Sequence, residues 1–134
     1  MKRIILLQFV ILFTLFGCKS ETGSTTADKS KSMKHKHPTL FKTIEIDGIT
    51  IAYREAGSPD NPTIVLLHGF PSSSHQYRKV LSELSDNFHL IAPDYPGFGN
   101  SDFPSASEYS YTFDNIAKTI DAFLIKKKIS RYAR

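Results

Sequence analysis

Several residue types and patterns that would narrow the function are scarce in this sequence. The chain has one cysteine, Cys18, and no tryptophan. A single cysteine excludes an intramolecular disulfide and any metal site built from several cysteines. A basic bias is missing from the globular part, since residues 39–134 carry ten Lys or Arg and eleven Asp or Glu residues. Basic and aromatic residues are not interleaved there, so we expect no nucleic-acid partner. We also expect no bound metal.

The positive charge is concentrated in residues 1–38, which carry seven Lys or Arg and two Asp or Glu residues. Residues 1–18, MKRIILLQFVILFTLFGC, begin with a short basic stretch and continue with fourteen uncharged, mostly apolar residues before the cysteine. A helix of that length reaches about 21 Å, which is short of the roughly 30 Å of a bilayer core. Such a segment is typical of a signal peptide.

The end of this leader, LFGC, resembles the signal of bacterial lipoproteins. Leu15, Gly17 and Cys18 match that signal, whereas Phe16 stands where a small residue is usual. The resemblance implies that Cys18 is lipidated and holds the protein in a membrane through its acyl chains. We therefore expect a lipoprotein on the non-cytoplasmic side of a bacterial cell envelope. An uncleaved membrane anchor with an incidental cysteine is the alternative.

Residues 19–38 are expected to form a flexible linker before a folded domain over residues 39–134. The linker is rich in Ser, Thr and Lys and has almost no apolar side chains. Such a stretch cannot bury enough surface to offset the entropy of ordering. Met33 is an alternative start that would give a form without the leader.

The first part of the domain has the pattern of β-strands. Apolar and polar residues alternate on both sides of Asp47-Gly48, which predicts a hairpin with strands over 42–47 and 49–55. The run TIVLLH (63–68) is continuously apolar, which is typical of a strand buried on both faces in a parallel sheet.

Two helices and one more strand follow. Ser73 and Gln76 have the spacing of a capping box, and FHLIAPD (88–94) predicts a second buried strand. Thr112 can cap a helix over 112–128. Apolar residues recur at helical spacing in Tyr77, Val80, Leu81 and Leu84, and again in Phe113, Ile116, Ile120, Phe123 and Leu124. The order of hairpin, strand, helix, strand, helix predicts an α/β fold.

Two motifs in this domain resemble the α/β-hydrolase fold, most closely its epoxide hydrolase and haloalkane dehalogenase branch. They are LLHGFPSSSHQYR (66–78) and HLIAPDYPGFGNSD (89–102), and the resemblance covers about residues 39–133. It implies an incomplete α/β-hydrolase fold, a small-molecule substrate and no cofactor. The residues that match are His68-Gly69-Phe70-Pro71 and Asp94-Tyr95-Pro96-Gly97-Phe98-Gly99-Asn100-Ser101.

The first motif is expected to form one side of an active site. Gly69 lets the backbone turn and approach a ligand closely, and Pro71 leaves the amide of Phe70 free. The resemblance implies that this amide is a donor of the oxyanion hole, that the Phe70 ring lines the pocket, and that Phe70-Pro71 is a cis bond. His68 is expected to be structural, packed beneath the loop. An ordinary strand-to-helix turn with Phe70 plugging the core is the alternative.

The second motif is expected to be a structural loop. Gly97 and Gly99 would allow a crowded loop over the strand end, and Asp94 and Ser101 would tie it by hydrogen bonds. A third glycine at the required spacing and a helix directly after it are both missing, so a dinucleotide site is not expected.

The sequence contains neither a G-x-S-x-G elbow nor the Asp-centred elbow of this branch, and an α/β hydrolase needs a nucleophile on such an elbow with an acid and a His. We therefore expect a hydrolase of epoxides, haloalkanes or esters that acts through a covalent ester, truncated before its nucleophile and inactive alone. The strand at 63–68 would then be an exposed apolar edge that favours self-association. A non-catalytic, membrane-anchored lipoprotein or binding module is the alternative.

Replacing Cys18 with Ser is expected to abolish incorporation of a labelled fatty acid, because the serine hydroxyl removes the thiol that would be acylated. Metabolic labelling of both proteins in a bacterial host measures this. Equal labelling of the two would contradict the lipoprotein prediction.

Overall fold

The computed structural model describes residues 37–134. The predicted leader, Cys18, Met33 and all of the linker before residue 37 lie outside the described residues, so lipidation and anchoring stay predictions. Between residues 37 and 134, the helices are too short or too polar to cross a bilayer.

The predicted hairpin is confirmed. Strand β1 (Leu40–Ile46) pairs antiparallel with β2 (Ile49–Ala56), with Ile46 opposite Ile49. The two turn residues, Asp47 and Gly48, have positive φ angles of 50° and 80°. A two-residue turn with both φ values positive matches the right-handed twist of the strands, so this local sequence fixes the register.

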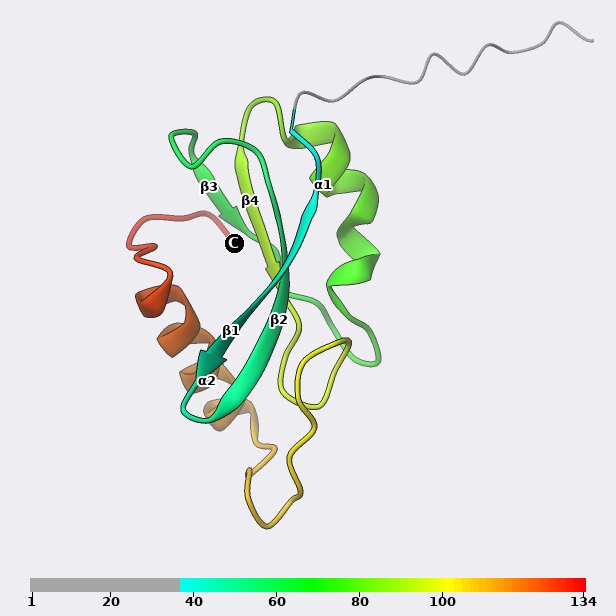
Figure 1. Cartoon of the computed structure of the whole chain (residues 1–134), viewed down its shortest axis with the longest axis vertical. Coiled ribbons are helices and arrows are strands. Elements are labelled where there is room, and N and C mark those ends of the chain that lie inside the picture. The colour runs from blue at the N-terminus through cyan, green and yellow to red at the C-terminus, as the bar shows by residue number, and fades with distance from the viewer. Residues whose placement is uncertain (1–36) are drawn as a thin grey trace, which may run out of the picture. The chain divides into compact units, whose positions relative to one another are not determined.

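The sheet has four strands in the order β1-β2-β4-β3 (Figure 1). Strand β4 (His89–Pro93) pairs antiparallel with β2 and parallel with β3 (Thr63–Val65). Strand β3 is shorter than the predicted 63–68. The chain stays beside β4 for one more residue, because the Leu66 N–H donates to the Ile91 carbonyl at 2.8 Å, and then leaves the sheet.

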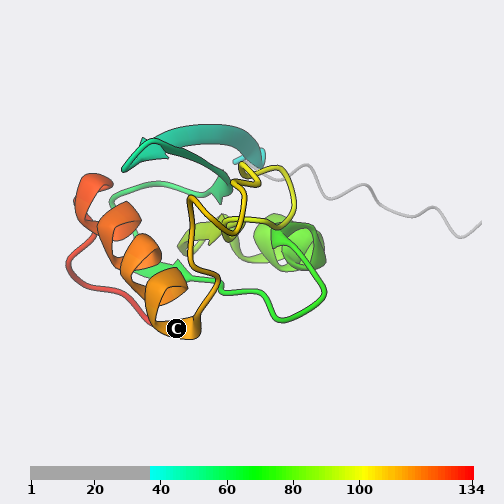
Figure 2. The same ribbon diagram turned by 90° about the horizontal axis from the view of Figure 1, so that it is seen from below.

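The helices cover opposite faces of this sheet (Figures 1 and 2). A 3-10 turn, η1 (Ser74–Tyr77), leads into α1 (Arg78–Leu84), and α2 (Phe113–Lys126) lies on the other face. As predicted, Thr112 caps α2, its side chain accepting a hydrogen bond from the Asn115 N–H at 3.2 Å.

The predicted capping box is only half formed. The Ser73 side chain accepts from the His75 N–H at 3.3 Å, but the Gln76 side chain returns no bond to Ser73. Its Oε1 instead accepts from the Ser72 hydroxyl at 3.0 Å. The cap therefore begins a tight 3-10 turn, whose geometry differs from that of the α-helical start the pattern assumes.

Each face of the sheet has its own apolar core, because side chains alternate along a strand. Toward α2 the core consists of Ile46, Ile51, Tyr53, Val65, Ile91, Ile120, Phe123 and Leu124. Toward α1 it consists of Ala56, Leu81, Leu90 and Ala92. Phe113 departs from the prediction, since its side chain is 93% exposed at the start of α2.

The edge of β3 is less open than the sequence suggests. Ala133 forms a parallel bridge with Ile64. The Val65 N–H donates to the Ala133 carbonyl at 2.9 Å, and the Ala133 N–H donates to the Thr63 carbonyl at 3.0 Å. The prediction of a wholly unpaired edge is therefore wrong at Thr63–Val65, because residues near Arg134 turn back alongside the strand.

A buried carboxylate, that of Glu55 in β2, joins several of these elements. It accepts hydrogen bonds from Lys42 of β1 at 2.7 Å, from His89 of β4 at 2.8 Å and from Lys127, which caps α2, at 3.2 Å. Burial alone would raise the pKa of Glu55, but these three donors outweigh it and lower the pKa from 4.5 to about 2.

Replacing Glu55 with Gln is expected to lower the free energy of unfolding by up to about 3 kcal/mol at neutral pH, because each unit of pKa shift corresponds to about 1.4 kcal/mol. A carboxylate with a lowered pKa contributes fully above its ordinary value of 4.5, and the contribution disappears as the pH falls through about 2. The difference between the two proteins should therefore shrink over that window in denaturant unfolding experiments.

The matched control is Glu45→Gln, a change on the exposed side of β1, which should leave the unfolding free energy unchanged. An equal loss in both variants, or a Glu55→Gln difference that does not depend on pH, would contradict the role of this carboxylate.

Candidate functional site

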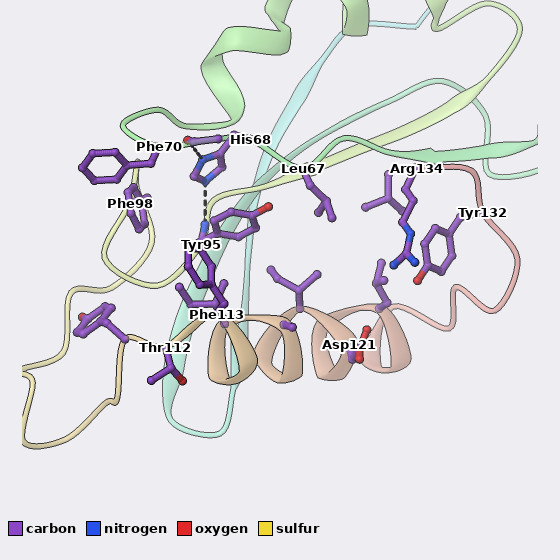
Figure 3. A pocket seen from close by; sticks show the side chains of 17 residues that line it. Leu67, His68, Phe70, Tyr95, Phe98, Thr112, Phe113, Asp121, Tyr132 and Arg134 are labelled. Carbon is purple, nitrogen blue, oxygen red and sulfur yellow. Dashed lines mark hydrogen bonds between the residues drawn. The ribbon is translucent and has the colours of Figure 1, made fainter.

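The turn between β3 and η1 contains the Phe70 backbone amide. The Phe70–Pro71 bond is cis, as predicted, and the Phe70 ring is 86% exposed. The ring therefore does not plug the core. Among residues 37–134, no group accepts a hydrogen bond from the Phe70 amide. Figure 3 shows the ring standing at the end of a cavity, near Phe98.

His68 supports this turn from beneath. Its ring is buried and lies against the ring of Tyr95, with centroids 4.1 Å apart. The Nε2 atom accepts from the Tyr95 N–H at 3.2 Å, while Nδ1 lies 2.9 Å from the Gly69 carbonyl. This pattern assigns the neutral tautomer with the proton on Nδ1. Both ring nitrogens are thus used within the loop, which leaves neither free to act on a substrate.

Asp94 lies at the end of β4 and holds two loops together. Its side chain is almost wholly buried, at 1% exposure for the residue. One carboxylate oxygen accepts from the Ser74 N–H at 2.6 Å and the other from the Asn100 N–H at 2.9 Å. The Ser101 hydroxyl donates to the Asp94 carbonyl at 2.7 Å and accepts from the Ala52 N–H at 2.9 Å. The two sequence motifs are therefore bonded to each other.

The loop after Asp94 passes too close to this carboxylate for any side chain. Gly99 has a φ of 56°, and a Cβ atom placed there would lie 2.2 Å from an Asp94 carboxylate oxygen. Gly97 also has a positive φ, and a Cβ there would lie 2.8 Å from the Tyr111 ring. Both glycines are needed for the loop to close over the strand end.

Two ties of this region do not follow from the motifs. Arg54 of β2 is buried and donates a hydrogen bond to the Ser74 hydroxyl, and its guanidinium stacks on the Phe41 ring at 4.6 Å. Asp102 accepts from the Thr50 N–H at 2.7 Å, and this backbone hydrogen bond lowers the pKa of the exposed Asp102 carboxyl. Arg54 and Glu55 are adjacent charged residues in one strand, so their side chains must face opposite sides of the sheet. This pattern in the sequence indicates that charged side chains lie on both faces.

A mostly apolar cavity of about 780 Å³ opens beside the turn. Its walls are the turn itself, the sheet-facing side of α2 and the last residues of the chain (Figure 3). The lining residues are Val65, Leu67, His68, Gly69, Phe70, Tyr95, Phe98, Tyr111, Thr112, Phe113, Ile116, Ala117, Ile120, Asp121, Leu124, Tyr132 and Arg134. Within residues 37–134, no group of three or more His, Cys, Asp or Glu side chains could hold a metal ion.

One arrangement elsewhere looks like catalytic machinery. Thr63 Oγ1 lies 3.1 Å from His89 Nδ1, and His89 Nε2 lies 2.8 Å from the Glu55 carboxylate. A hydroxyl, an imidazole and a carboxylate in a row are the components of a nucleophile–base–acid triad. However, Glu55 is shared with two lysines, and neither Thr63 nor His89 lines the cavity beside the turn. We therefore regard these contacts as structural.

The architecture and the two motifs agree with the comparisons to known proteins. The sequence profile of the alpha/beta hydrolase fold matches residues 62–132. The chain belongs to the α/β-hydrolase fold family. An uncharacterized hydrolase of Saccharomyces cerevisiae is 44% identical over 94 residues, which is 69% of this chain and 32% of that protein. A haloalkane dehalogenase of Bradyrhizobium diazoefficiens is 38% identical over 98 residues, 68% of this chain and 31% of its own.

The solved structures that this chain resembles include members of the haloalkane dehalogenase branch. The crystal structure of haloalkane dehalogenase DbeA from Bradyrhizobium elkani superimposes with a TM-score of 0.64 at 35% identity, over 69% of this chain and 31% of that one. The resemblance to the epoxide hydrolase and haloalkane dehalogenase branch is thereby confirmed. The chain spans about a third of the length of the curated relatives it matches.

Replacing Gly99 with Ala is expected to destabilise the α/β-hydrolase domain by about 2–5 kcal/mol. A left-handed backbone costs an ordinary residue about 1–2 kcal/mol, and displacement of the Asp94 carboxylate would break buried hydrogen bonds worth about 1–3 kcal/mol. Denaturant unfolding measures the sum.

Gly48→Ala is the matched control, because Gly48 has a φ of 80° but a Cβ atom placed there would meet nothing within 4 Å. The Gly48→Ala variant should lose only the free energy of unfolding that an alanine in the left-handed backbone conformation costs. Equal losses in the two variants would mean that the contact between Gly99 and Asp94 does not constrain the loop.

Proposed function

We propose that residues 66–71 supply the oxyanion side of a hydrolase active site, with the Phe70 amide as the donor. The observation that supports this best is the Phe70 amide, which has no acceptor among residues 37–134 and belongs to a residue that lines an apolar cavity. His68 fills the space beneath the turn, and Asp94 fixes the start of η1 behind it. A backbone donor held by such contacts needs no reorganisation when charge develops.

The proposed chemistry is hydrolysis through a covalent ester. With an ester substrate, attack by a nucleophile turns the carbonyl oxygen into an oxyanion, which the amide stabilises. With an epoxide or a haloalkane, an Asp nucleophile would first form an alkyl ester by opening the ring or displacing the halide. Water then attacks the carbonyl of that ester, the same kind of oxyanion forms, and the alcohol leaves.

The nucleophile, its base and its acid are proposed to come from outside residues 37–134. The serines of the first motif are engaged elsewhere: the Ser72 hydroxyl donates to Gln76, Ser73 caps η1, and Ser74 is buried against Arg54. None of the three hydroxyls forms a hydrogen bond with an imidazole in the described part of the chain. We therefore expect no turnover from this segment by itself.

A chimera tests the role of Phe70. The matched segment of the Bradyrhizobium diazoefficiens dehalogenase is exchanged for that of this chain, and residue 70 is then replaced by the α-hydroxy analogue of phenylalanine, which removes the amide hydrogen and keeps the ring. Loss of one oxyanion donor is expected to lower kcat by about 10²–10³-fold.

Phe70→Leu in the same chimera is the control, since it keeps the amide and changes the ring. Its effect should fall mainly on KM, because the ring lines the cavity. A chimera that is fully active with the α-hydroxy analogue would rule out the Phe70 amide as a donor. Steady-state kinetics on a haloalkane, the substrate class named for the parent dehalogenase, measures both effects.

A further inference from the structure

We propose that a second cavity, built around the Arg54 guanidinium, binds a small molecule with a single carboxylate. The cavity measures about 200 Å³, and none of its lining residues lines the cavity beside the Phe70 turn. Binding there does not depend on the proposed role of the Phe70 amide, so either proposal can fail without the other. The lining residues are Phe41, Lys42, Thr43, Ala52, Tyr53, Arg54, Ser74, Asp94 and Asn100.

The hairpin brings Arg54 and its neighbours to one face of the sheet. In the register of β1 and β2, Phe41 lies opposite Arg54, and Thr43 lies opposite Ala52. Residues that pair across two strands point to the same side. This side is the one that α1 covers, because Ala56, two residues beyond Arg54, belongs to the core there. A ligand bound at Arg54 would therefore lie across the sheet from the cavity that α2 lines.

Arg54 is a buried cation with no carboxylate bonded to it in the described part of the chain. The residue is only 7% exposed, and the ion pairs found between residues 37 and 134 use Glu55 instead. The Phe41 ring lies 4.6 Å from the guanidinium carbon, which offsets part of the cost of removing this charge from water. An anion in the cavity would supply the missing opposite charge.

One edge of the guanidinium is free for such an anion. Nη1 donates to the Ser74 hydroxyl, Nη2 lies 3.5 Å from His75 Nδ1, and Nε has no acceptor within residues 37–134. Every fully buried side-chain nitrogen in that range has a partner, so Nε must be open to the cavity that Arg54 lines. The N–H of Nε and one N–H of Nη2 point the same way, an arrangement that fits the two oxygens of a carboxylate.

Asp94 limits the charge that the ligand can carry. Its carboxylate lines the cavity and accepts two backbone N–H groups, but it forms no ion pair with Arg54. The negative charge of Asp94 lowers the positive potential in the cavity, so a singly charged ligand is favoured over a doubly charged phosphate. Lys42 adds no unpaired charge, because its ammonium lies 2.7 Å from the Glu55 carboxylate.

The size and the walls of the cavity favour a short apolar tail on the ligand. Phe41, Ala52 and Tyr53 contribute to its wall. Its volume of about 200 Å³ is several times the roughly 30 Å³ that one water molecule occupies in the liquid. A carboxylate with a chain of a few carbon atoms fits this space, and propanoate is the simplest probe.

Titration of the full chain with sodium propanoate tests the site. We expect a saturable shift of the Arg54 Nε–H signal in NMR spectra and a higher midpoint of thermal unfolding, because a ligand that binds only the folded protein stabilises it. Chloride and inorganic phosphate at matched ionic strength are the comparison anions. Chloride lacks the second oxygen and phosphate carries more charge, so each is expected to bind about tenfold more weakly or less.

Two variants at one exposed position of β1 provide the matched pair. Thr43 lines the cavity and is a diagonal neighbour of Arg54 across the hairpin, within reach of a long side chain. Thr43→Glu is expected to weaken propanoate binding about tenfold or more, since its carboxylate would repel the ligand and bond the guanidinium. Thr43→Gln has the same length without the charge and should bind nearly as the parent does. Circular dichroism should show both variants folded.

Three results would overturn the proposal. The first is an Arg54 Nε–H signal that shows no saturable shift in a large excess of propanoate. The second is equal binding of propanoate by Thr43→Glu and Thr43→Gln. The third is binding of chloride or phosphate as tight as that of propanoate, which would show that the cavity does not recognise a carboxylate.

Discussion

The loops that form the candidate site depend on one buried carboxylate. Asp94 receives the backbone N–H of Ser74 on one oxygen and that of Asn100 on the other, so the turn before α1 and the loop after β4 are fixed to the same strand end. A charged acceptor bonded by backbone donors is stronger than a neutral one, and its exclusion from water makes either bond costly to lose. The position of Phe70 follows, because Phe70 lies between β3 and the segment that Asp94 holds.

A second carboxylate performs the same task on the opposite side of the sheet. Glu55 gathers cations from β1 and from the end of α2 and an imidazole from β4, so the helix that walls the cavity is attached to the strands by charge as well as by packing. Ion pairs of this kind stabilise a fold when every partner is satisfied. In the described part of the chain, no buried side-chain nitrogen or oxygen lacks a hydrogen-bond partner.

Local chemistry explains which features could be predicted from sequence. Asp47-Gly48 specifies its own hairpin, and the spacing of Ile120, Phe123 and Leu124 specifies the buried side of α2. The Glu55 cluster could not be predicted, because its partners lie 13, 34 and 72 residues away along the chain. Helical periodicity includes Phe113 but cannot tell whether anything covers it, and the short β3 reflects where the chain leaves the sheet rather than where its apolar run ends.

The exposed Phe70 has a consequence for how such a site can diversify. If the Phe70 amide stabilises the developing charge, the stabilising group is a backbone N–H, which nearly all amino acids have. A mutation at this codon therefore replaces the ring but keeps the N–H. Selection could then change the substrate specificity of the pocket while the stabilisation of the oxyanion stays constant. Proline is the exception, because it lacks the N–H. A backbone donor under a variable side chain thus separates the evolution of substrate choice from that of rate.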